Sequence, residues 1–333
     1  MTGSVLVLAN VRRTVAGWAD SLALLRSRGF TVDDPGDALE AGEAARRAAA
    51  VDAIIVGGTH PLGRKVLEAS ARLRVVSRQG VGMDNIDLET ATRLGVPVCN
   101  TAGCNSDAVA DHTMALLLHL TRDLGRQDAL TRAGRGWEDG WPPTLTQLAG
   151  KTLAILGTGN IGRAVARRAS AFGMRLLGHD LVPDAGLVDQ LGLRYLALEE
   201  MLPLADVFTI HVPLTTRTRG LIGPRQLGLL RPHTLLINTA RGGVVDEHAL
   251  ADALRGGRLA GAGVDVYEVE PRIQSPLFEL ERVVLTPHLG GSSVESSRAA
   301  RMWAAENLIS FFEGAPRNIV NPEAVTRGGQ TPR

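Results

Sequence analysis

Short apolar runs alternate with helix-like segments along almost the whole chain. The runs in its first part are SVLVLA, AIIV, LRVVS and VPVCN, at 4–9, 53–56, 73–77 and 96–100. The helix-like segments there lie at 18–28, 38–50, 64–71 and 88–94. Short runs that are apolar throughout are typical of buried parallel strands. Their alternation with helices predicts the repeated βαβ units of an open α/β sheet.

A second alternating series begins at Lys151. Its apolar runs are TLAIL, MRLLGHD, VFTIHV, TLLINTA, LAGAGVDV and RVVLTPH, between residues 152 and 288. Before this series, a long apolar-rich helix is predicted over 105–123, and RAGRGWEDGWPP, 132–143, has the composition of an exposed arm. After it we expect another long helix over 294–313 and a polar tail that frays from about Val325.

The two series predict two Rossmann-like or flavodoxin-like α/β domains. We expect the first domain to comprise 1–102 together with 293–333, so that the last helix returns to it. The second domain, 103–292, is then inserted into the first. Ligands of open α/β sheets bind at the carboxyl ends of the strands, and catalytic crevices commonly form between two such domains. The polar residues at strand ends are therefore the first candidates for chemistry.

Composition narrows the class of protein and of partner. With 333 residues, of which 44% are apolar and 21% charged, the chain has the make-up of a globular protein of two ordinary domains. The net charge of +1, without blocks of Lys or Arg, argues against nucleic acid or an anionic membrane as a partner. SVLVLA lacks the charged leader of a signal sequence, and no run approaches the ~18 apolar residues of a membrane span. Cys99 and Cys104 form neither a disulfide framework nor a zinc pattern, so we expect no metal and a reducing cytoplasm.

GTGNIG at 157–162 matches the G-x-G-x-x-G pattern of dinucleotide-binding loops. It follows the strand-like TLAIL and opens a helix-like segment, which is the context that the pattern requires. Gly157, Gly159 and Gly162 would permit a tight turn and let backbone N–H groups at the helix start face a pyrophosphate. The alternative is a glycine turn that serves only packing.

Asp180 ends the next strand-like run, 18 residues after Gly162. A carboxylate here can accept hydrogen bonds from both ribose hydroxyls of a dinucleotide and would repel a 2′-phosphate. Leu181, Val182 and Pro183 follow, so no arginine stands where it would hold such a phosphate. The sequence therefore predicts NAD rather than NADP as the cofactor.

Three later runs end in residues suited to the chemistry of a 2-oxo acid. Arg241 follows LLINTA, Glu270 follows LAGAGVDV by way of Asp265, and His288 lies in TPHLGG after VVL. An arginine can bind a carboxylate bidentately and polarise the adjacent carbonyl. A histidine can protonate the carbonyl oxygen as hydride arrives, and a neighbouring carboxylate would orient the imidazole and favour its charged form. The proline and glycines of TPHLGG would fix the imidazole and leave room for a cofactor.

Each of these residues also has a structural interpretation. Arg241 could pair with Asp246, and Glu270 could be a solvated loop charge. Asp265 could cap a turn, and His288 could be a packed surface residue. Their shared position at one rim of the predicted sheet favours the functional interpretation.

The chain resembles the D-isomer-specific 2-hydroxyacid dehydrogenase family, and most of all its phosphoglycerate-dehydrogenase-like branch. The matching motifs occur in order over nearly the whole chain: SRQGVGMDNIDLETAT at 77–92, GKTLAILGTGNIG at 150–162, INTARGGVVDE at 237–247, GVDVYEVEP at 263–271 and TPHLGGSS at 286–293. The resemblance implies an NAD-dependent oxidoreductase that interconverts a 2-oxo acid and a D-2-hydroxy acid. It also implies a homodimer, to whose interface the arm at 137–141 could belong.

The resemblance implies a role for each site residue. Arg241 would orient the substrate, His288 would act as the acid–base group and Glu270 would be its partner. Backbone amides around Val81 and Gly82, together with Arg78, would bind the substrate. The implied cofactor contacts are Gly157, Gly159, Asn160, Ile161, Gly162, Asp180, Val212, Thr239, Ala240, Arg241, Asp265, His288, Gly290 and Gly291.

The chain departs from the family's pattern at two positions. Phosphoglycerate dehydrogenases place an arginine after the third strand, where it helps to bind the substrate phosphate. Here that stretch, 56–63, reads VGGTHPLG and has Gly57 at the arginine's position. Asp111 stands where the family commonly has Glu, a change expected to matter little. His60 would face the substrate pocket and could tune its specificity.

Several alternatives remain open at this point. The enzyme could be a D-3-phosphoglycerate dehydrogenase proper, or a related formate dehydrogenase, although that branch has Gln at the position of Glu270. A different class of function is an NAD(H)-sensing corepressor-like binding protein. Of the other histidines, His112 and His119 lie on one face of the predicted helix and are expected to be packed and hydrogen-bonded. His211 is expected to line the site without transferring a proton.

Overall fold

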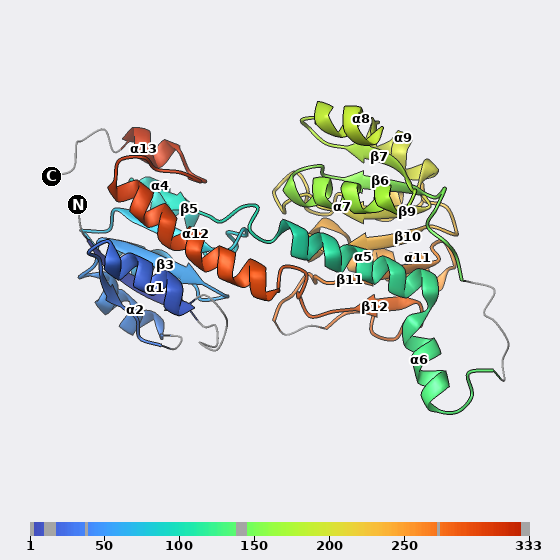
Figure 1. Ribbon diagram of the computed structural model, residues 1–333, viewed down its shortest axis with the longest axis horizontal. Helices are drawn as coiled ribbons and strands as arrows, with labels where there is room; N and C mark the ends of the chain where they lie inside the picture. Colours follow the sequence, from blue (N-terminus) through green and yellow to red (C-terminus); the bar gives the residue numbers. More distant parts are fainter. Residues whose placement is uncertain (1–2, 10–17, 37–38, 138–144, 272–273, 328–333) are drawn as a thin grey trace. The chain divides into compact units, whose positions relative to one another are not determined.

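The structure, a computed structural model, describes residues 3–9, 18–36, 39–137, 145–271 and 274–327 (Figure 1). The chain divides into two compact units. Unit 1 comprises Met1–Asn105 and Ser292–Arg333, and unit 2, Ser106–Gly291, is inserted into it. Each unit is a parallel sheet with helices on both faces, so the predicted α/β class with Rossmann-like and flavodoxin-like folds is confirmed.

Unit 1 is built on a five-stranded parallel sheet in the order β2-β1-β3-β4-β5. Its strands are β1 Ser4–Ala9, β2 Thr31–Asp33, β3 Ala53–Gly57, β4 Val75–Gln79 and β5 Val98–Cys99. This order is the flavodoxin-like arrangement, in which the chain reverses direction across the sheet between β1 and β3.

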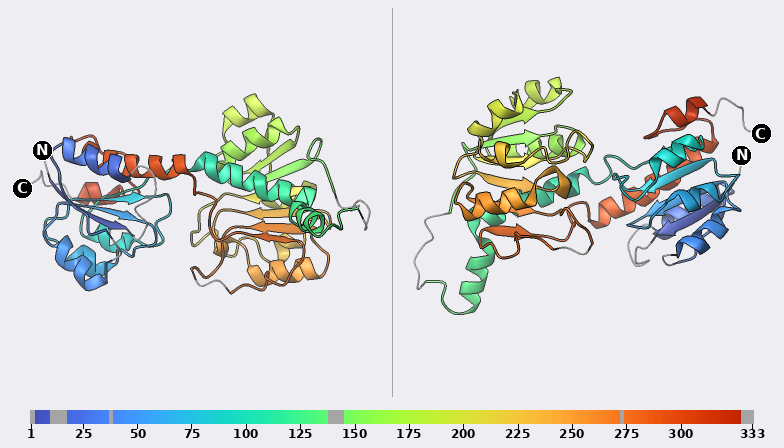
Figure 2. Two further views of the ribbon diagram at one scale, coloured as in Figure 1. Left: turned by 60° about the horizontal axis from the view of Figure 1, so that its bottom comes forward. Right: turned by 180° about the vertical axis from the view of Figure 1, so that it is seen from behind.

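The strands of unit 1 feed two cores because successive side chains point to opposite faces of a sheet. Leu6 and Leu8 of β1 pack into the core that is covered by α2 (Ala41–Ala48), α3 (Arg64–Glu68) and α4 (Leu88–Arg93). Val5 and Val7 pack into the opposite core, which is covered by α1 (Trp18–Ser27) and α12 (Val294–Phe312) (Figure 2). The long helix after TPHLGG thus belongs to unit 1.

Unit 2 is built on a seven-stranded parallel sheet in the order β12-β11-β10-β9-β6-β7-β8. Its strands are β6 Thr152–Leu156, β7 Arg175–His179, β8 Arg194–Tyr195, β9 Val207–Ile210, β10 Leu235–Asn238, β11 Gly261–Val264 and β12 Val283–Leu285. The chain runs outward from β6 to β8 and then continues on the other side from β9. Open α/β sheets bind ligands at such a switch point, here between β6 and β9.

Helices cover both faces of the unit 2 sheet (Figure 1). One core packs α5 (Ser106–Arg122), α7 (Asn160–Ala171) and α8 (Ala185–Leu191) against the strands. The other core packs α9 (Leu198–Met201), α10 (Pro224–Leu227) and α11 (Glu247–Arg255). Within the described residues, no helix is both long and apolar enough to cross a membrane.

The hydrophobic pattern did not predict four short elements. Strands β2 and β8 are edge strands of three and two residues, too short to contain an apolar run. Helix α6 (Leu124–Arg132) buries none of its side chains and therefore has no apolar stripe. Near the C-terminus, α13 (Glu323–Arg327) is helical over the first residues of the tail that was expected to fray from about Val325, and the rest of that tail lies outside the described residues. Of the predicted arm at 137–141, Trp137 is exposed and the rest lies outside the described residues.

Candidate active site

The GTGNIG turn joins β6 to α7 at the switch point of unit 2. Gly157 has φ 91°, and a Cβ on it would lie 2.9 Å from the backbone of His211 and Val212. A Cβ on Gly162 would lie 2.0 Å from the carbonyl oxygen of Gly157. These two glycines are therefore required by close approach of the backbone.

Gly159 differs because a Cβ on it would meet nothing within 4 Å. It is the N-cap residue of α7, and among the described residues no side chain caps that end of the helix. The first N–H groups of α7, those of Asn160 and Ile161, lie at the positive end of the helix dipole. They thus have no capping side chain as an acceptor. An open space beside uncapped amides fits the pyrophosphate of a dinucleotide.

Asp180 follows β7 and contacts the same turn. Its Oδ2 accepts hydrogen bonds from the N–H of Thr158 at 2.6 Å and from the Thr158 hydroxyl at 3.2 Å, and its Oδ1 accepts one from the N–H of Val182 at 3.1 Å. Burial works to raise the pKa of Asp180, but these hydrogen bonds outweigh burial and hold the pKa below its usual value. A fixed negative charge therefore stands beside the glycine turn, where a dinucleotide would place its ribose.

The loop that carries Arg241 begins at Asn238, the last residue of β10. The amide oxygen of Asn238 accepts a hydrogen bond from the N–H of Ala240 at 3.1 Å, and its Nδ2 donates to the carbonyl of Arg241 at 3.1 Å. A Cβ on the next residue, Gly242, would lie 1.9 Å from the carbonyl carbon of Tyr267. Only glycine lets the Arg241 loop lie directly against the loop that leads from β11 to Glu270.

The structure brings Glu270 and His288 together. Nδ1 of His288 lies 2.6 Å from Oε2 of Glu270, and Oε1 of Glu270 accepts the N–H of Tyr267 at 2.9 Å. Burial works to raise the pKa of Glu270, but the hydrogen bonds from His288 and Tyr267 and the charges of His288 and Arg241 hold the pKa below its usual value. An ionised carboxylate thus occupies one nitrogen of the half-exposed imidazole and leaves Nε2 for a substrate.

Asp265 follows β11 and is buried, with 1% of its surface exposed. Its carboxylate accepts hydrogen bonds from the Thr286 hydroxyl at 2.5 Å, from the N–H of Leu289 at 2.8 Å and from the N–H of Gly290 at 2.7 Å. A Cβ on Gly290 would lie 2.9 Å from Oδ2 of Asp265. Gly290 therefore makes room for Asp265, and its expected contact with a cofactor stays a prediction. The contact of Asp265 with a cofactor stays a prediction.

The remaining predicted cofactor contacts lie at the same edge of the sheet. Val212 follows β9, Thr239 and Ala240 follow β10, and Gly291 follows β12. His211 lies between β9 and Val212, with Nε2 2.9 Å from Oγ1 of Thr209. Burial lowers the pKa of His211 to about 3, so its ring is neutral at physiological pH and has no acidic proton to donate.

In unit 1, Arg78 makes contacts that the sequence did not predict. Its guanidinium donates hydrogen bonds to the carbonyls of Gly58 at 2.8 Å, Gln79 at 2.6 Å and Gly82 at 3.2 Å. Arg78 thus ties the loop after β3 to the loop after β4, which contains Val81 and Gly82. The direct role of these three residues in substrate binding stays a prediction.

Gly57 ends β3 in a confined space. A Cβ on Gly57 would lie 2.5 Å from Oε1 of Gln79 and 3.2 Å from Cβ of Ala9. A larger residue at 57 would therefore require the end of the Gln79 side chain to move. His60 in the following loop is buried, and its Nδ1 lies 3.2 Å from the carbonyl oxygen of Pro61. Its predicted role in specificity stays a prediction.

Sequence reasoning missed Tyr267, which contacts both Glu270 and the turn that carries His288. Its N–H binds Glu270, and its phenol donates a hydrogen bond to the carbonyl of Thr286 at 3.1 Å. Burial, with smaller contributions from the carboxylates nearby, raises the pKa of Tyr267 to about 12, so the phenol stays protonated. The only feature of the sequence that could have indicated this role is the position of an aromatic residue between Asp265 and Glu270.

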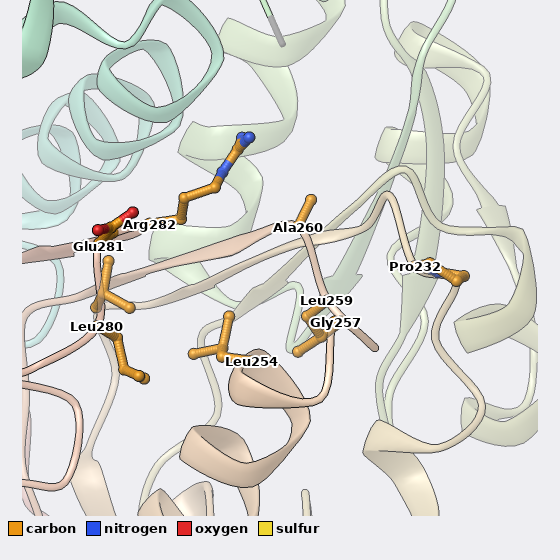
Figure 3. Close-up of a pocket in the computed structure, with 9 residues that line it drawn as sticks. Pro232, Leu254, Gly257, Leu259, Ala260, Leu280, Glu281 and Arg282 are labelled. Atoms are coloured by element: carbon orange, nitrogen blue, oxygen red, sulfur yellow. The ribbon is translucent and has the colours of Figure 1, made fainter.

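A separate hollow in unit 2 lies away from these residues (Figure 3). Leu254, Leu259, Leu280 and Arg282 are among the residues that line it. It lies at the amino ends of β11 and β12, which begin at Gly261 and Val283, and so at the edge opposite His288. In the described part of the chain, no group of three or more His, Cys, Asp or Glu residues could hold a metal ion.

Comparison with known proteins shows which family the chain resembles. Residues 114–290 match the model of the NAD binding domain of the D-isomer specific 2-hydroxyacid dehydrogenases. The chain is 41% identical over 283 residues to a glyoxylate reductase of Thermococcus litoralis, which covers 83% of this chain and 85% of that protein. It is 40% identical over 281 residues to a D-3-phosphoglycerate dehydrogenase of Mycobacterium tuberculosis, covering 84% of this chain but 52% of that protein.

Solved structures agree with this similarity. An NADPH-dependent glyoxylate/hydroxypyruvate reductase of Sinorhizobium meliloti, in complex with NADP and malonate, is 31% identical and superposes with a TM-score of 0.82, covering 96% of this chain and 97% of that one. Arg241, Glu270 and His288 all lie within the matched NAD binding domain. The chain is thus a nicotinamide-dependent oxidoreductase acting on CH–OH groups, and it belongs to the D-isomer specific 2-hydroxyacid dehydrogenase family.

Proposed function

We propose that the protein uses NADH to reduce a small, unphosphorylated 2-oxo acid, with glyoxylate as the model substrate, to the 2-hydroxy acid. The observation that carries the proposal is the Glu270–His288 pair, with its 2.6 Å contact, at a strand exit of a dinucleotide-binding unit. The glyoxylate reductases among the relatives support glyoxylate as the first substrate to test.

Three side chains divide the work. Arg241 binds the substrate carboxylate and polarises its carbonyl, because a guanidinium presents two parallel donors. Nε2 of His288 donates a proton to the carbonyl oxygen, while Glu270 holds Nδ1 and stabilises the charged imidazole before the transfer. The bound nicotinamide supplies the hydride. In the reverse direction, neutral His288 removes the hydroxyl proton.

The surroundings of Asp180 support NADH over NADPH. Its carboxylate is held by Thr158 at the glycine turn, and a 2′-phosphate placed there would meet a fixed negative charge. Leu181 and Val182 are exposed and apolar, and neither could pair with a phosphate. One structural relative is NADPH-dependent, so the relatives do not decide between the two cofactors. The proposed preference for NADH rests on Asp180, Leu181 and Val182.

Replacing Asp180 with alanine should lower the preference for NADH over NADPH by ~10-fold or more, because the repulsion of the 2′-phosphate is removed. The ratio of kcat/KM values for the two cofactors at saturating glyoxylate measures this. Asp189→Ala, which removes an exposed aspartate on α8, is the matched control and should leave the ratio unchanged. An unaltered ratio in Asp180→Ala would mean that discrimination lies elsewhere.

The space around Gly57 favours an unphosphorylated substrate over 3-phosphohydroxypyruvate. The resemblance to phosphoglycerate dehydrogenases implies an arginine at this position, whereas this chain has a glycine, with the end of the Gln79 side chain where a Cβ would stand. A substrate phosphate would lack that charge partner, and buried or half-buried anions without a partner bind poorly.

A panel of 2-oxo acids tests the proposed substrate class. We expect kcat/KM with NADH to be higher for glyoxylate than for phosphohydroxypyruvate, by a factor on the order of 10². The reverse order would identify a phosphoglycerate dehydrogenase. If the protein bound NADH but oxidised it with no oxo acid, the cofactor-sensing binding protein would become the better explanation.

A further inference from the structure

We infer that His112 of α5 is a positioning residue for the proton donor, acting through Thr286 and Asp265 on the turn that carries His288. This inference rests on the proposed function of His288. Nε2 of His112 lies 2.9 Å from Oγ1 of Thr286, which in turn lies 2.5 Å from Oδ1 of Asp265. The three side chains connect a helix, the turn and the end of β11.

The turn has a backbone conformation that needs support. His288 has φ 55°, in the left-handed region that non-glycine residues seldom adopt and that strains their backbone. Its N–H donates to the carbonyl oxygen of Asp265 at 2.7 Å. The next two N–H groups, of Leu289 and Gly290, donate to the carboxylate of the same residue. Asp265 therefore binds three successive amides and holds His288 in this conformation.

The direction of the hydrogen bonds follows from the charge of Asp265. Burial works to raise the pKa of Asp265, but the bonds from His112, Thr286, Leu289 and Gly290 outweigh burial and hold the pKa below its usual value. An ionised carboxylate only accepts, so the Thr286 hydroxyl donates to it. The hydroxyl oxygen is then free to accept, which assigns the donated proton to Nε2 of His112.

His112 also closes the far side of this cluster. Its Nε2 lies 3.4 Å from Oδ1 of Asp265, and a Cβ on Gly290 would lie 3.6 Å from its Cδ2. The His112 ring therefore lies close both to Asp265 and to the turn that carries His288. Removing it would leave the acceptor of Thr286 without its donor and free the hydroxyl to rotate away from Asp265.

The consequence for catalysis is geometric. Nδ1 of His288 must stay within reach of Glu270 while Nε2 points at the substrate, and a displacement of ~1 Å in such a site costs on the order of 10²-fold in rate. The Tyr267 hydroxyl donates a hydrogen bond to the carbonyl of Thr286, and the Thr286 hydroxyl donates one to Asp265. Both polar groups of Thr286 therefore have fixed partners. We assign to the hydrogen bonds of His112 and Thr286 the placement of His288; the predicted contact of Asp265 with a cofactor is separate from this role.

Two pairs of variants test the inference. His112→Phe and Thr286→Val remove the hydrogen bond and keep the volume, whereas His112→Gln and Thr286→Ser retain a donor or a hydroxyl at the same place. His119→Phe, seven residues further along α5, is the matched control. The measurements are kcat and KM for glyoxylate, the NADH dissociation constant from fluorescence, and amide hydrogen exchange of the segment 286–291.

We expect His112→Phe and Thr286→Val to lower kcat by ~10- to 100-fold with the NADH dissociation constant unchanged. Amide exchange at Leu289 and Gly290 should accelerate in both, because local opening becomes easier. His112→Gln and Thr286→Ser should restore most of both properties, and His119→Phe should match the wild type. A loss through general destabilisation would instead lower NADH binding and protection throughout unit 2.

His288→Ala measured beside these variants separates the two claims. If His288→Ala is inactive while His112→Phe and Thr286→Val keep wild-type kcat and wild-type exchange in the turn, the positioning inference is overturned and the proposed function stands. If His288→Ala itself keeps its turnover, the proposed role of His288 fails first, and the positioning inference falls with it.

Discussion

Replacing His288 with alanine is expected to lower kcat for glyoxylate reduction by ~10²–10⁴-fold, the usual contribution of a positioned general acid. The loss arises because neither of the two titratable side chains described alongside His288, His211 and Glu270, is suited to supply the proton. Burial keeps His211 neutral, and Glu270 is held as an acceptor. Binding of NADH should be nearly unchanged, since Nε2 of His288 acts on the substrate. Steady-state kinetics and a fluorescence titration with NADH measure the two effects.

The chain contains a matched control for this substitution. His233 also pairs with a carboxylate, since its Nε2 lies 3.0 Å from Oδ1 of Asp206, but this pair stands at the amino end of the unit 2 sheet. His233→Ala should therefore retain wild-type kcat. Equal turnover in His288→Ala and His233→Ala would remove His288 from its proposed role.

Replacing Arg241 with alanine should lower kcat/KM for glyoxylate by a factor on the order of 10², because charge-assisted hydrogen bonds to the substrate carboxylate are lost. Arg241→Lys should recover only part of this loss, since an ammonium retains the charge but not the two parallel donors. The NADH dissociation constant serves as the control for folding and cofactor binding. Full activity in Arg241→Lys would show that the charge alone suffices and that bidentate binding is not used.

The fold was predictable wherever an element buries a continuous apolar run. The sequence predicts four strands directly because helices cover both of their faces and their residues are apolar throughout: β1, β3, β6 and β9. The edge strands β2 and β8 form through backbone pairing with a neighbour, for which two or three residues carry no pattern. Helix α6 escaped prediction for the related reason that none of its side chains is buried.

The candidate site was predictable in the identity of its residues and in one contact, that of Glu270 with His288, but not in its other contacts. Glycine turns and strand exits identified Gly157, Asp180, Arg241 and His288 as candidates, because these residue types have few other reasons to stand there. Which partner each residue binds depends on tertiary packing between segments far apart in sequence. Asp265 is the plainest case, because its carboxylate binds the turn 21 to 25 residues later.

Arg78 illustrates the same limit in unit 1. A lone arginine at a strand end predicts an anion contact, which stays a prediction, but nothing in the sequence indicates that its donors also reach the carbonyls of two neighbouring loops. No periodicity encodes such a contact, because it depends on where the loops after β3 and β4 come together. The identity of residue 78 as arginine indicated a positive charge but not which hydrogen-bond acceptors the side chain contacts.

The most direct test of the account is NADH consumption by the purified protein with glyoxylate, with the product identified and His288→Ala assayed in parallel. The wild type is expected to form one glycolate for each NADH oxidised, and the variant to form almost none while still binding NADH. Wild-type protein that binds NADH but forms no hydroxy acid, or a variant that forms it as fast, would contradict the account.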